Sequence, residues 1–373
     1  MSINILALTM LIFCTALCAA EVRIDADYPG GNIVVNKIED NAVCLHQDLR
    51  DTKGRWFYWN FRVRGAAGRT LTFHFTKRNV FGTQGPAVSV DDGLTWSWLG
   101  TKMIKGTTFS YKFPPDAESV RFAFSLPYQE ADLKRFLARH KGNKHLAVHE
   151  LCKTRKKRSV ERIHIGRLDG PPKHRVLITC RHHSCESTAS CVVEGMMDAL
   201  LAKTDDGKWL RENVEVMVVR FMDKDGVEDG GQGKGRKPRD HCRDYVGNSL
   251  YPLVRTLRTF VPEWSAGRLS VALDFHCPYI RDNKIYQVGS SHKDIWAEQK
   301  KFGTILESLI DKALPYKPAN DVPFGMSWNK ASNYKEGKSF FQWAEELEGN
   351  QFASAFEIPY AQSAKSIITP DTA

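Results

Sequence analysis

The stretch RVLITCRHHSCE, residues 175–186, joins a mostly apolar strand to two histidines and a glutamate. Its first half, residues 175–180, is short and nearly continuous in apolar character, which is typical of a strand buried in an α/β sheet. Small residues then lead into an apolar helix, which we expect at about 189–203. His183 and Glu186 stand three residues apart, a spacing that occurs often by chance. A metal site therefore needs further ligands from elsewhere in the chain.

The C-terminal two thirds of the chain repeats this alternation of strand and helix. Apolar runs predict further strands at 214–221, 269–275 and 352–356. Periodic apolar positions predict helices at about 130–140, 249–260 and 293–313. Uninterrupted apolar strands separated by helices indicate an α/β fold, with a mixed, mostly parallel sheet and helices on both faces.

The N-terminal part has a different pattern, in which polar and apolar residues alternate over short segments. The segments are 56–63, 70–75, 87–90, 95–99, 108–113 and 120–124. Several short strands at near-regular spacing predict an antiparallel β-sandwich, with the aromatic residues in its core. We therefore expect a β-sandwich domain over residues 21–125 and an α/β domain over residues 126–373.

Residues 1–20 carry no charged side chain, and the apolar run within them is too short to span a membrane. They end in small residues before Glu21, which predicts a secretory signal peptide that is removed on export to the periplasm or the extracellular space. No other stretch predicts a transmembrane helix. Of nine cysteines, two lie in this segment and seven outside it. Export permits disulfides among the seven, an odd number leaves one unpaired, and the absence of a C-x-x-C pair argues against a zinc ribbon.

The chain of 373 residues is long enough for two domains and carries a formal charge of +10. Its densest basic run is 153–158, where no aromatic residues are interleaved. We interpret this run as a solvated connector, and we expect no nucleic-acid partner. The positive charge still favours acidic substrates or an anionic surface.

Chemically active side chains follow four of the predicted strands. They are His183 and Glu186 after 175–180, His276 after 269–275, Glu357 after 352–356, and Asp223, Asp225, Arg236, Arg239, Asp240 and Arg243 after 214–221. In open α/β sheets, ligands bind beyond the carboxyl ends of the strands, and these side chains would meet there. One histidine or glutamate at a strand end is more often structural, but convergence from four strands favours a functional site.

The residue types suit metal-assisted hydrolysis. Two histidines and a glutamate form a three-ligand zinc set that leaves one coordination position open. A zinc ion held in this way lowers the pKa of water and polarises a carbonyl group. A separate carboxylate must then take and return the proton, and Glu357 is our candidate because it lies on a different strand end from the ligands. An arginine can hold a terminal carboxylate by two parallel hydrogen bonds, and Asp240 is a candidate to orient a histidine ligand.

These segments resemble the M14 zinc carboxypeptidases, and most closely their cytosolic-carboxypeptidase-like branch, in which a β-sandwich precedes the catalytic domain. HSCESTAS, residues 183–190, is similar to the H-x-G-E-T-x-A-S segment of that branch. DGV at 225–227, DHCR at 240–243 and FE at 356–357 resemble its D-G-V, D-x-N-R and F-E segments. The resemblance covers nearly all of the chain after residue 20.

The resemblance implies a role for each site residue. His183, Glu186 and His276 would hold one Zn²⁺ per chain, and His183 is favoured over its neighbour His182 by the family spacing. Glu357 would be the catalytic base, Arg243 would bind the substrate carboxylate, and Asp240 would orient His183. Arg236 would stabilise the oxyanion, and Tyr334, which precedes Trp343, would be the mobile substrate-binding tyrosine; a surface tyrosine is the alternative.

The chain departs from the family pattern at two cysteines. Cys242 replaces an asparagine beside the carboxylate-binding arginine, and Cys185 replaces a glycine within H-x-x-E. With Cys277 they flank the expected site, where they would pair as a disulfide or approach the metal. Phe341 and Gln342 precede the late tryptophan, where the family's specificity pocket is lined; the absence of an acidic residue there argues against a preference for lysine or arginine.

Three functions are compatible with these observations. The first is a secreted zinc metallocarboxypeptidase, a hydrolase that removes C-terminal residues from peptides with a free carboxylate. The second is a zinc amidase or deacylase that acts on cell-wall peptides or N-acyl amino acids. The third is a non-catalytic binding protein, which retention of His183, Glu186, His276 and Glu357 argues against.

Overall fold

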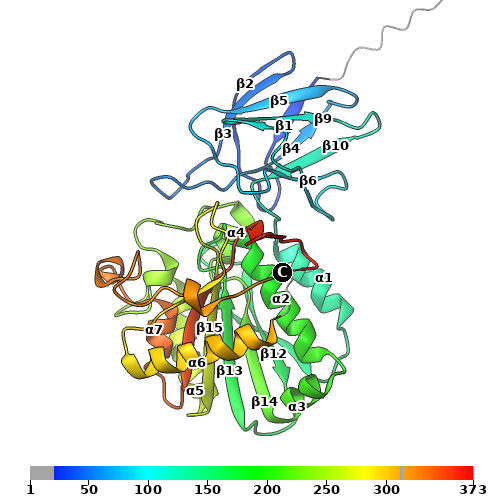
Figure 1. The fold of residues 1–373 in the computed structure, drawn as a ribbon. Helices are drawn as coiled ribbons and strands as arrows, with labels where there is room; N and C mark the ends of the chain where they lie inside the picture. Colours follow the sequence, from blue (N-terminus) through cyan, green and yellow to red (C-terminus); the bar gives the residue numbers. More distant parts are fainter. Residues whose placement is uncertain (1–20, 311–313, 373) are drawn as a thin grey trace, which may run out of the picture.

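The protein is described by a computed structural model, which covers residues 21–310 and 314–372. The predicted signal peptide, residues 1–20, lies outside the described residues. Figure 1 shows a β-sandwich stacked on one end of an α/β part, beside helix α4 and the C-terminal segment. Over the described residues, no helix has the length and apolar character to cross a membrane.

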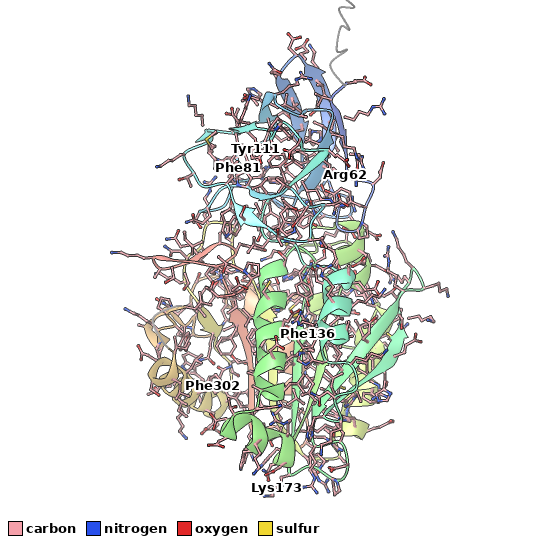
Figure 2. All side chains as sticks on the ribbon, turned by 90° about the vertical axis from the view of Figure 1, so that its right-hand side faces the viewer. Arg62, Phe81, Tyr111, Phe136, Lys173 and Phe302 are labelled. Atoms are coloured by element: carbon pink, nitrogen blue, oxygen red, sulfur yellow. The ribbon has the colours of Figure 1, made fainter. Side chains whose placement is uncertain are left out.

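Two five-stranded sheets form the sandwich, in the orders β1-β4-β10-β6-β7 and β2-β3-β5-β9-β8. Their strands are β1 Arg23–Asp25, β2 Val34–Glu39, β3 Ala42–His46, β4 Asn60–Arg64, β5 Thr70–Phe75, β6 Ala87–Ser89, β7 Ser97–Trp98, β8 Ile104–Lys105, β9 Thr108–Lys112 and β10 Ser119–Ala123. The predicted sandwich is confirmed, although β3 and β5 pair in parallel. Fully buried aromatic rings, among them Trp59, Phe73 and Phe109, fill its core, and Phe81 and Tyr111 mark this part in Figure 2.

One predicted sandwich strand begins later than expected. The alternating segment 56–63 forms strand β4 only from Asn60. Before it, the backbone N–H of Tyr58 donates to the side chain of Gln232 in the α/β part, at 2.7 Å. The residues before Asn60 therefore use their polar groups at the junction between the two parts.

The α/β part contains a seven-stranded sheet in the order β11-β12-β14-β13-β15-β17-β16. Its strands are β11 Leu146–Lys153, β12 Ser159–Gly166, β13 His174–Cys180, β14 Val214–Val219, β15 Leu269–His276, β16 Tyr286–Val288 and β17 Phe352–Glu357. The four central strands, β14, β13, β15 and β17, are parallel, whereas both edges pair antiparallel. A short hairpin, β18 Gln362–Ser363 and β19 Ser366–Ile367, follows. The mixed sheet is as predicted.

The basic run 153–158 is the turn of the hairpin that β11 and β12 form, which sequence reasoning did not predict. Two of its side chains are paired with carboxylates of helix α4: Lys156 Nζ lies 2.7 Å from Asp229, and Arg158 contacts both Asp225 and Asp229. The run therefore fastens a sheet edge to the loop region, and it is more than a solvated connector.

Helices cover both faces of the sheet, as predicted. They are α1 Glu130–Arg139, α2 Ser187–Leu201, α3 Asp205–Asn213, α4 Lys224–Asp229, α5 Pro252–Ser265, α6 Lys293–Leu309 and α7 Phe340–Ala344, with 3-10 turns at His241–Arg243, Pro318–Asn320 and Ala331–Tyr334. Apolar residues of α1, α2 and α6 join one core cluster, and those of α5 and α7 join another. Side chains alternate along each strand, so the two clusters occupy opposite faces.

Candidate active site

The residues His183, Glu186 and His276, here called the metal-ligand group, come together at the carboxyl ends of β13 and β15. One ligand atom from each lies within 4.8 Å of the others. Nδ1 of His183 is 2.8 Å from one Glu186 oxygen, and Nδ1 of His276 is 2.8 Å from the other. Two imidazole nitrogens thus converge on one carboxylate, a donor set that fits Zn²⁺.

The turn after β13 is shaped by a buried arginine. Arg181 adopts a left-handed conformation with φ of 63°, uncommon for a residue other than glycine. Arg181 is 1 % exposed, and its guanidinium donates to the carbonyl oxygens of Ser184 and Tyr128. These bonds hold the segment from His183 to Glu186 against the first turn of α2.

Further polar residues orient the two histidines from behind. Asp240 Oδ2 lies 3.2 Å from Nε2 of His183. Asp274 contacts Nε2 of His276 at 2.7 Å and Nδ1 of His182 at 2.9 Å. His182 is completely buried and its other nitrogen meets the Tyr245 hydroxyl, so its ring is already bonded at both nitrogens. His182, Asp274 and His276 also satisfy the geometry of a metal-binding set, but all three are buried, whereas the His183 side chain is 16 % exposed and leaves the metal-ligand group open to a substrate.

The group is electrostatically suited to a cation. Burial alone would lower the pKa of His183, yet Glu186 and Asp240 raise it to about 10. Burial would raise the pKa of Glu186, but His183, Lys234 and His276 hold it well below its usual value. The carboxylates around the imidazoles thus favour positive charge at this point, and a divalent ion would supply it.

Glu357 ends strand β17 beside His276, its partner in the parallel register. Its Oε2 is buried and has no hydrogen-bond partner among the described residues. Burial raises the pKa of Glu357 to about 7, where Lys234 lowers it and Glu186 raises it further. A carboxyl group with a pKa near neutrality is suited to general acid–base catalysis.

Lys234 is a site residue that sequence reasoning missed. Its ammonium lies 2.7 Å from Glu186 Oε1 and 2.7 Å from the Cys277 carbonyl oxygen, and its side chain is 13 % exposed. Gly233, with φ of 80°, lets the loop pass so close that an added Cβ would lie 2.3 Å from the Ser184 nitrogen. A lysine between two glycines, in a loop that follows a predicted strand, was the available signal.

The loop that carries Lys234 is held by the sandwich. Gln232 accepts from the Tyr58 N–H and donates to the Tyr58 carbonyl oxygen at 2.9 Å. Asn32 donates to the Gly230 carbonyl oxygen at 2.7 Å. The two parts of the chain therefore meet along this loop.

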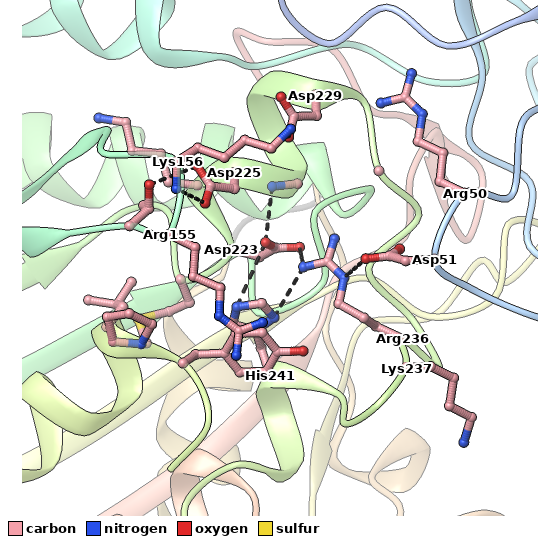
Figure 3. Close-up of a pocket in the computed structure, with 18 residues that line it drawn as sticks. Arg50, Asp51, Arg155, Lys156, Asp223, Asp225, Asp229, Arg236, Lys237 and His241 are labelled. Atoms are coloured by element: carbon pink, nitrogen blue, oxygen red, sulfur yellow. Dashed lines mark hydrogen bonds and ion pairs between the residues drawn. The ribbon is translucent and has the colours of Figure 1, made fainter.

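Arg236 does not reach the metal-ligand group. Figure 3 shows its guanidinium between Asp51 and Asp223, which lie 2.6 Å from Nε and one terminal nitrogen, with His241 below. We call these four residues the junction cluster; they line a cavity of ≈ 350 Å³ between the sandwich and the α/β part. This placement argues against the oxyanion role predicted for Arg236, because both carboxylates already occupy the guanidinium.

Arg243 and Tyr334, the two residues expected to bind the substrate, lie against each other. The Arg243 guanidinium carbon lies 4.8 Å from the centre of the Tyr334 ring, and Nε donates to the Asn333 carbonyl oxygen at 3.0 Å. The Tyr334 hydroxyl donates to Asn329 Oδ1 at 2.7 Å. The guanidinium keeps donors free for a ligand, since its bonds recorded within the described residues are to backbone carbonyls.

The cysteines near the site form no disulfide. All seven described cysteines are free thiols, so the disulfide, one of the two alternatives for Cys185, Cys242 and Cys277, is not formed. Cys242 Sγ lies 3.8 Å from Nε2 of His276, the nitrogen that faces away from Glu186. Cys185 Sγ lies 3.5 Å from the Tyr360 hydroxyl. Neither thiol therefore points at the place where the ligand atoms converge.

The chain is similar in sequence to cytosolic carboxypeptidases. Residues 24–125 match the cytosolic carboxypeptidase N-terminal domain. The chain is 23% identical to cytosolic carboxypeptidase 2 of Xenopus tropicalis, over 82% of this chain and 34% of that protein. It is 24% identical to cytosolic carboxypeptidase 2 of Danio rerio, over 76% of this chain and 43% of that protein. The chain thus spans less than half the length of these curated relatives.

Solved structures share the fold of most of the chain. A metallo-carboxypeptidase from Burkholderia cenocepacia superposes with a TM-score of 0.74 at 20% identity, covering 91% of this chain and 90% of that one. A metallo-carboxypeptidase from Pseudomonas aeruginosa, in complex with (2-guanidinoethylmercapto)succinic acid, gives 0.69 at 20% identity with the same coverage. The resemblance to M14 metallocarboxypeptidases predicted from the sequence is confirmed.

Proposed function

We propose that the protein is a zinc-dependent metallocarboxypeptidase that hydrolyses the C-terminal peptide bond of peptides with a free carboxylate. The observation that carries this proposal is the buried Oε2 of Glu357, which has no hydrogen-bond partner among the described residues and lies one strand away from His183, Glu186 and His276. The fold shared with metallocarboxypeptidases supports the same reading. Zinc, when bound by these three residues, supplies Lewis-acid activation of water and of the peptide carbonyl.

Each remaining residue has a part in positioning or proton transfer. Arg243 would hold the substrate carboxylate by a two-bonded contact, with the Tyr334 ring beneath its guanidinium. Glu357 would take a proton from the attacking water and pass it to the nitrogen of the leaving amino acid. Asp240 would keep Nδ1 of His183 directed at the metal through its bond to Nε2.

We assign to Lys234 the charge stabilisation that the resemblance had given to Arg236. Its ammonium already faces Glu186 and the carbonyl oxygen of Cys277. A fixed positive charge at this place would stabilise the oxyanion that forms as the scissile carbonyl is attacked. An ammonium is a compact charge that can contact a single oxygen, whereas the planar guanidinium of arginine suits contact with two.

The direct test uses zinc-loaded protein and N-blocked dipeptides. We expect release of single C-terminal amino acids, loss of activity with a chelator and recovery with zinc. Glu357→Gln should lower kcat by about 10³-fold at unchanged zinc content. Glu336→Gln, in an exposed glutamate paired with Lys237, is the matched control. A protein without stoichiometric zinc whose activity survives Glu357→Gln would contradict the proposal.

The alternative function, an amidase or deacylase, needs the same zinc ligands but no anchor for a substrate carboxylate. It is worth testing because Cys242 stands where the family has an asparagine beside the carboxylate-binding arginine. A carboxypeptidase should lose activity on peptides with an amidated C-terminus and should show kcat/KM lower by about 100-fold in Arg243→Ala. An amidase would hydrolyse the amidated peptides and tolerate the substitution.

Export is a separate part of the proposal and rests on residues 1–20 alone. The relatives are named cytosolic carboxypeptidases, a name that does not support export. The mass of the mature N-terminus in cell fractions would decide, because export requires a chain that begins near Glu21 outside the cytoplasm.

A further inference from the structure

A row of charged side chains crosses one face of the sheet at the end opposite the metal-ligand group. Four adjacent strands supply them: His149 of β11, Arg162 and His164 of β12, Glu215 of β14 and Arg175 of β13. Further along β13 and β14, the same face carries Leu177 and Met217, which pack in the apolar cluster with α5. Strand β13 runs for about 20 Å between this row and the metal-ligand group. Lys173, directly before β13, marks this end of the molecule in Figure 2.

The row lines a cavity of ≈ 420 Å³, here called the basal cavity. The loop between β12 and β13 adds Arg167 and Leu168 to its lining, and the end of α5 adds Trp264. The volume is that of a small-molecule site. The basal cavity therefore has room for a ligand, and its charges indicate which kind.

The carboxylate of Glu215 is already balanced within the lining. One oxygen accepts from Nδ1 of His164 and from the indole nitrogen of Trp264, both at 2.8 Å, and the other accepts from Nε of Arg175 at 2.9 Å. Burial would raise the pKa of Glu215, but these three hydrogen bonds lower it to about 2. Among the described residues that line the basal cavity, no second carboxylate is present. Arg175 thus uses the one negative charge available.

Arg162 is left without a negative partner. Its terminal nitrogen donates to Nε2 of His164 at 2.8 Å, and its guanidinium carbon lies 4.6 Å from the centre of the Phe260 ring. A guanidinium can donate but cannot accept, so Nε2 is the acceptor and the His164 ring is neutral. Burial lowers the pKa of Arg162, against the weaker effect of Glu215. The cation is therefore partly desolvated and lies against a neutral ring.

Arg167 is the second cation that the lining leaves unbalanced. Its Nε is buried and has no hydrogen-bond partner among the described residues. A terminal nitrogen donates to the Glu212 carbonyl oxygen at 3.0 Å. The carboxylate of Asp169 is 4.0 Å away and 92 % exposed, so water screens its charge. A buried donor without an acceptor is costly, which points to a ligand that accepts from it.

We propose that the basal cavity binds a phosphate group. Arg162 and Arg167 together offer two positive charges, and a phosphate monoester carries a charge between about −1.5 and −2 at neutral pH. A carboxylate would balance one of the two arginines. The donors approach from three places, β12, the loop after it and His149 of β11, which suits the several oxygens of a phosphate group. Leu168 and Trp264 provide apolar walls for an organic part.

The experiment is calorimetric titration of the zinc-loaded full chain with inorganic phosphate, phenyl phosphate and benzoate. We expect one phosphate-binding site per chain, with a Kd below about 1 mM for phenyl phosphate and binding of benzoate at least about tenfold weaker. Arg162→Gln and Arg167→Gln should each weaken phosphate binding by at least about tenfold at unchanged zinc content. Lys208→Gln, in a nearby lysine that is 70 % exposed, removes the same charge and should leave the affinity within about twofold.

The two phosphate probes distinguish the sources of the group. Phenyl phosphate bound at least about tenfold more tightly than inorganic phosphate would assign an organic phosphate, and equal affinity would assign free phosphate. Benzoate bound as tightly as phenyl phosphate would overturn the inference. So would phosphate binding that survives both arginine substitutions, which would place the anion at the zinc ion, or an equal loss in Lys208→Gln. The basal cavity does not depend on the proposed function, so a protein without peptidase activity would leave this result intact.

Discussion

The metal-ligand group and the junction cluster lie against the same Gly-rich loop, yet their charges are balanced in different ways. In the junction cluster, Arg236 sits between two aspartates at 2.6 Å, so the cation is already present. In the metal-ligand group, Lys234 supplies one ammonium against the three carboxylates of Glu186, Asp240 and Asp274, and the two imidazoles must be neutral to bind a metal. A complete charge cluster stabilises the fold, and an incomplete one awaits a ligand. Substitutions of Lys234 and Arg236 test this difference, because the first should affect activity and the second should affect stability.

The largest effect is expected when Lys234 is removed. Lys234→Met should lower kcat/KM by about 10²- to 10³-fold, because the charge facing the scissile carbonyl is lost. Lys237→Met, in an exposed lysine on the same loop, is the control and should retain activity. Steady-state kinetics with zinc content measured in parallel would check this. Full activity in Lys234→Met would return the oxyanion role to another residue.

Arg236→Ala should destabilise the junction cluster and have little effect on activity. It leaves Asp223, which is 2 % exposed, without its cation, and the free energy of unfolding should fall by about 3 kcal/mol. Activity per folded molecule should stay within about threefold. Urea denaturation and active-site titration would separate the two effects. A loss of kcat at unchanged stability would show that Arg236 acts in catalysis after all.

Asp274→Asn should loosen the metal-ligand group from behind. The carboxylate orients His276, and its loss should weaken zinc binding by about 10- to 100-fold. Competition with a chelator would measure the change. Asp294→Asn, on the exposed first turn of α6, should leave zinc affinity unchanged. An unaltered affinity in Asp274→Asn would mean that backbone packing alone fixes the histidine.

Sequence reasoning succeeded where regular structure fixes position. The strands 175–180, 269–275 and 352–356 agree with β13, β15 and β17 to within one residue at each end. Because parallel strands end at the same edge of a sheet, these strands alone predict that His183, His276 and Glu357 lie near one another. The same argument could not predict which loop cation lies beside Glu186, where the structure has Lys234 rather than Arg236. Gly230, Gly233 and Gly235 all have positive φ, and such a loop has no periodicity from which a side-chain direction follows.

Elements that depend on tertiary contacts were missed for a related reason. The hairpin β11–β12 lies at a sheet edge and has a largely exposed outer strand, so its sequence lacks the apolar run of a central strand. Helix α7 spans only five residues, too few for a helical period to appear.

The contacts of Gln232 and Gly230 with the sandwich have a consequence for how the protein is made. The N-terminal part emerges from the ribosome first and can fold while the loop is still unsynthesised. Tyr58 and Asn32 of the folded sandwich can then form hydrogen bonds with the loop as it is synthesised, and these bonds position Lys234 beside Glu186. A fragment of residues 126–373 would contain the sheet and its histidines, but its loop would lack the hydrogen bonds from Asn32 and Tyr58 that hold Gly230 and Gln232.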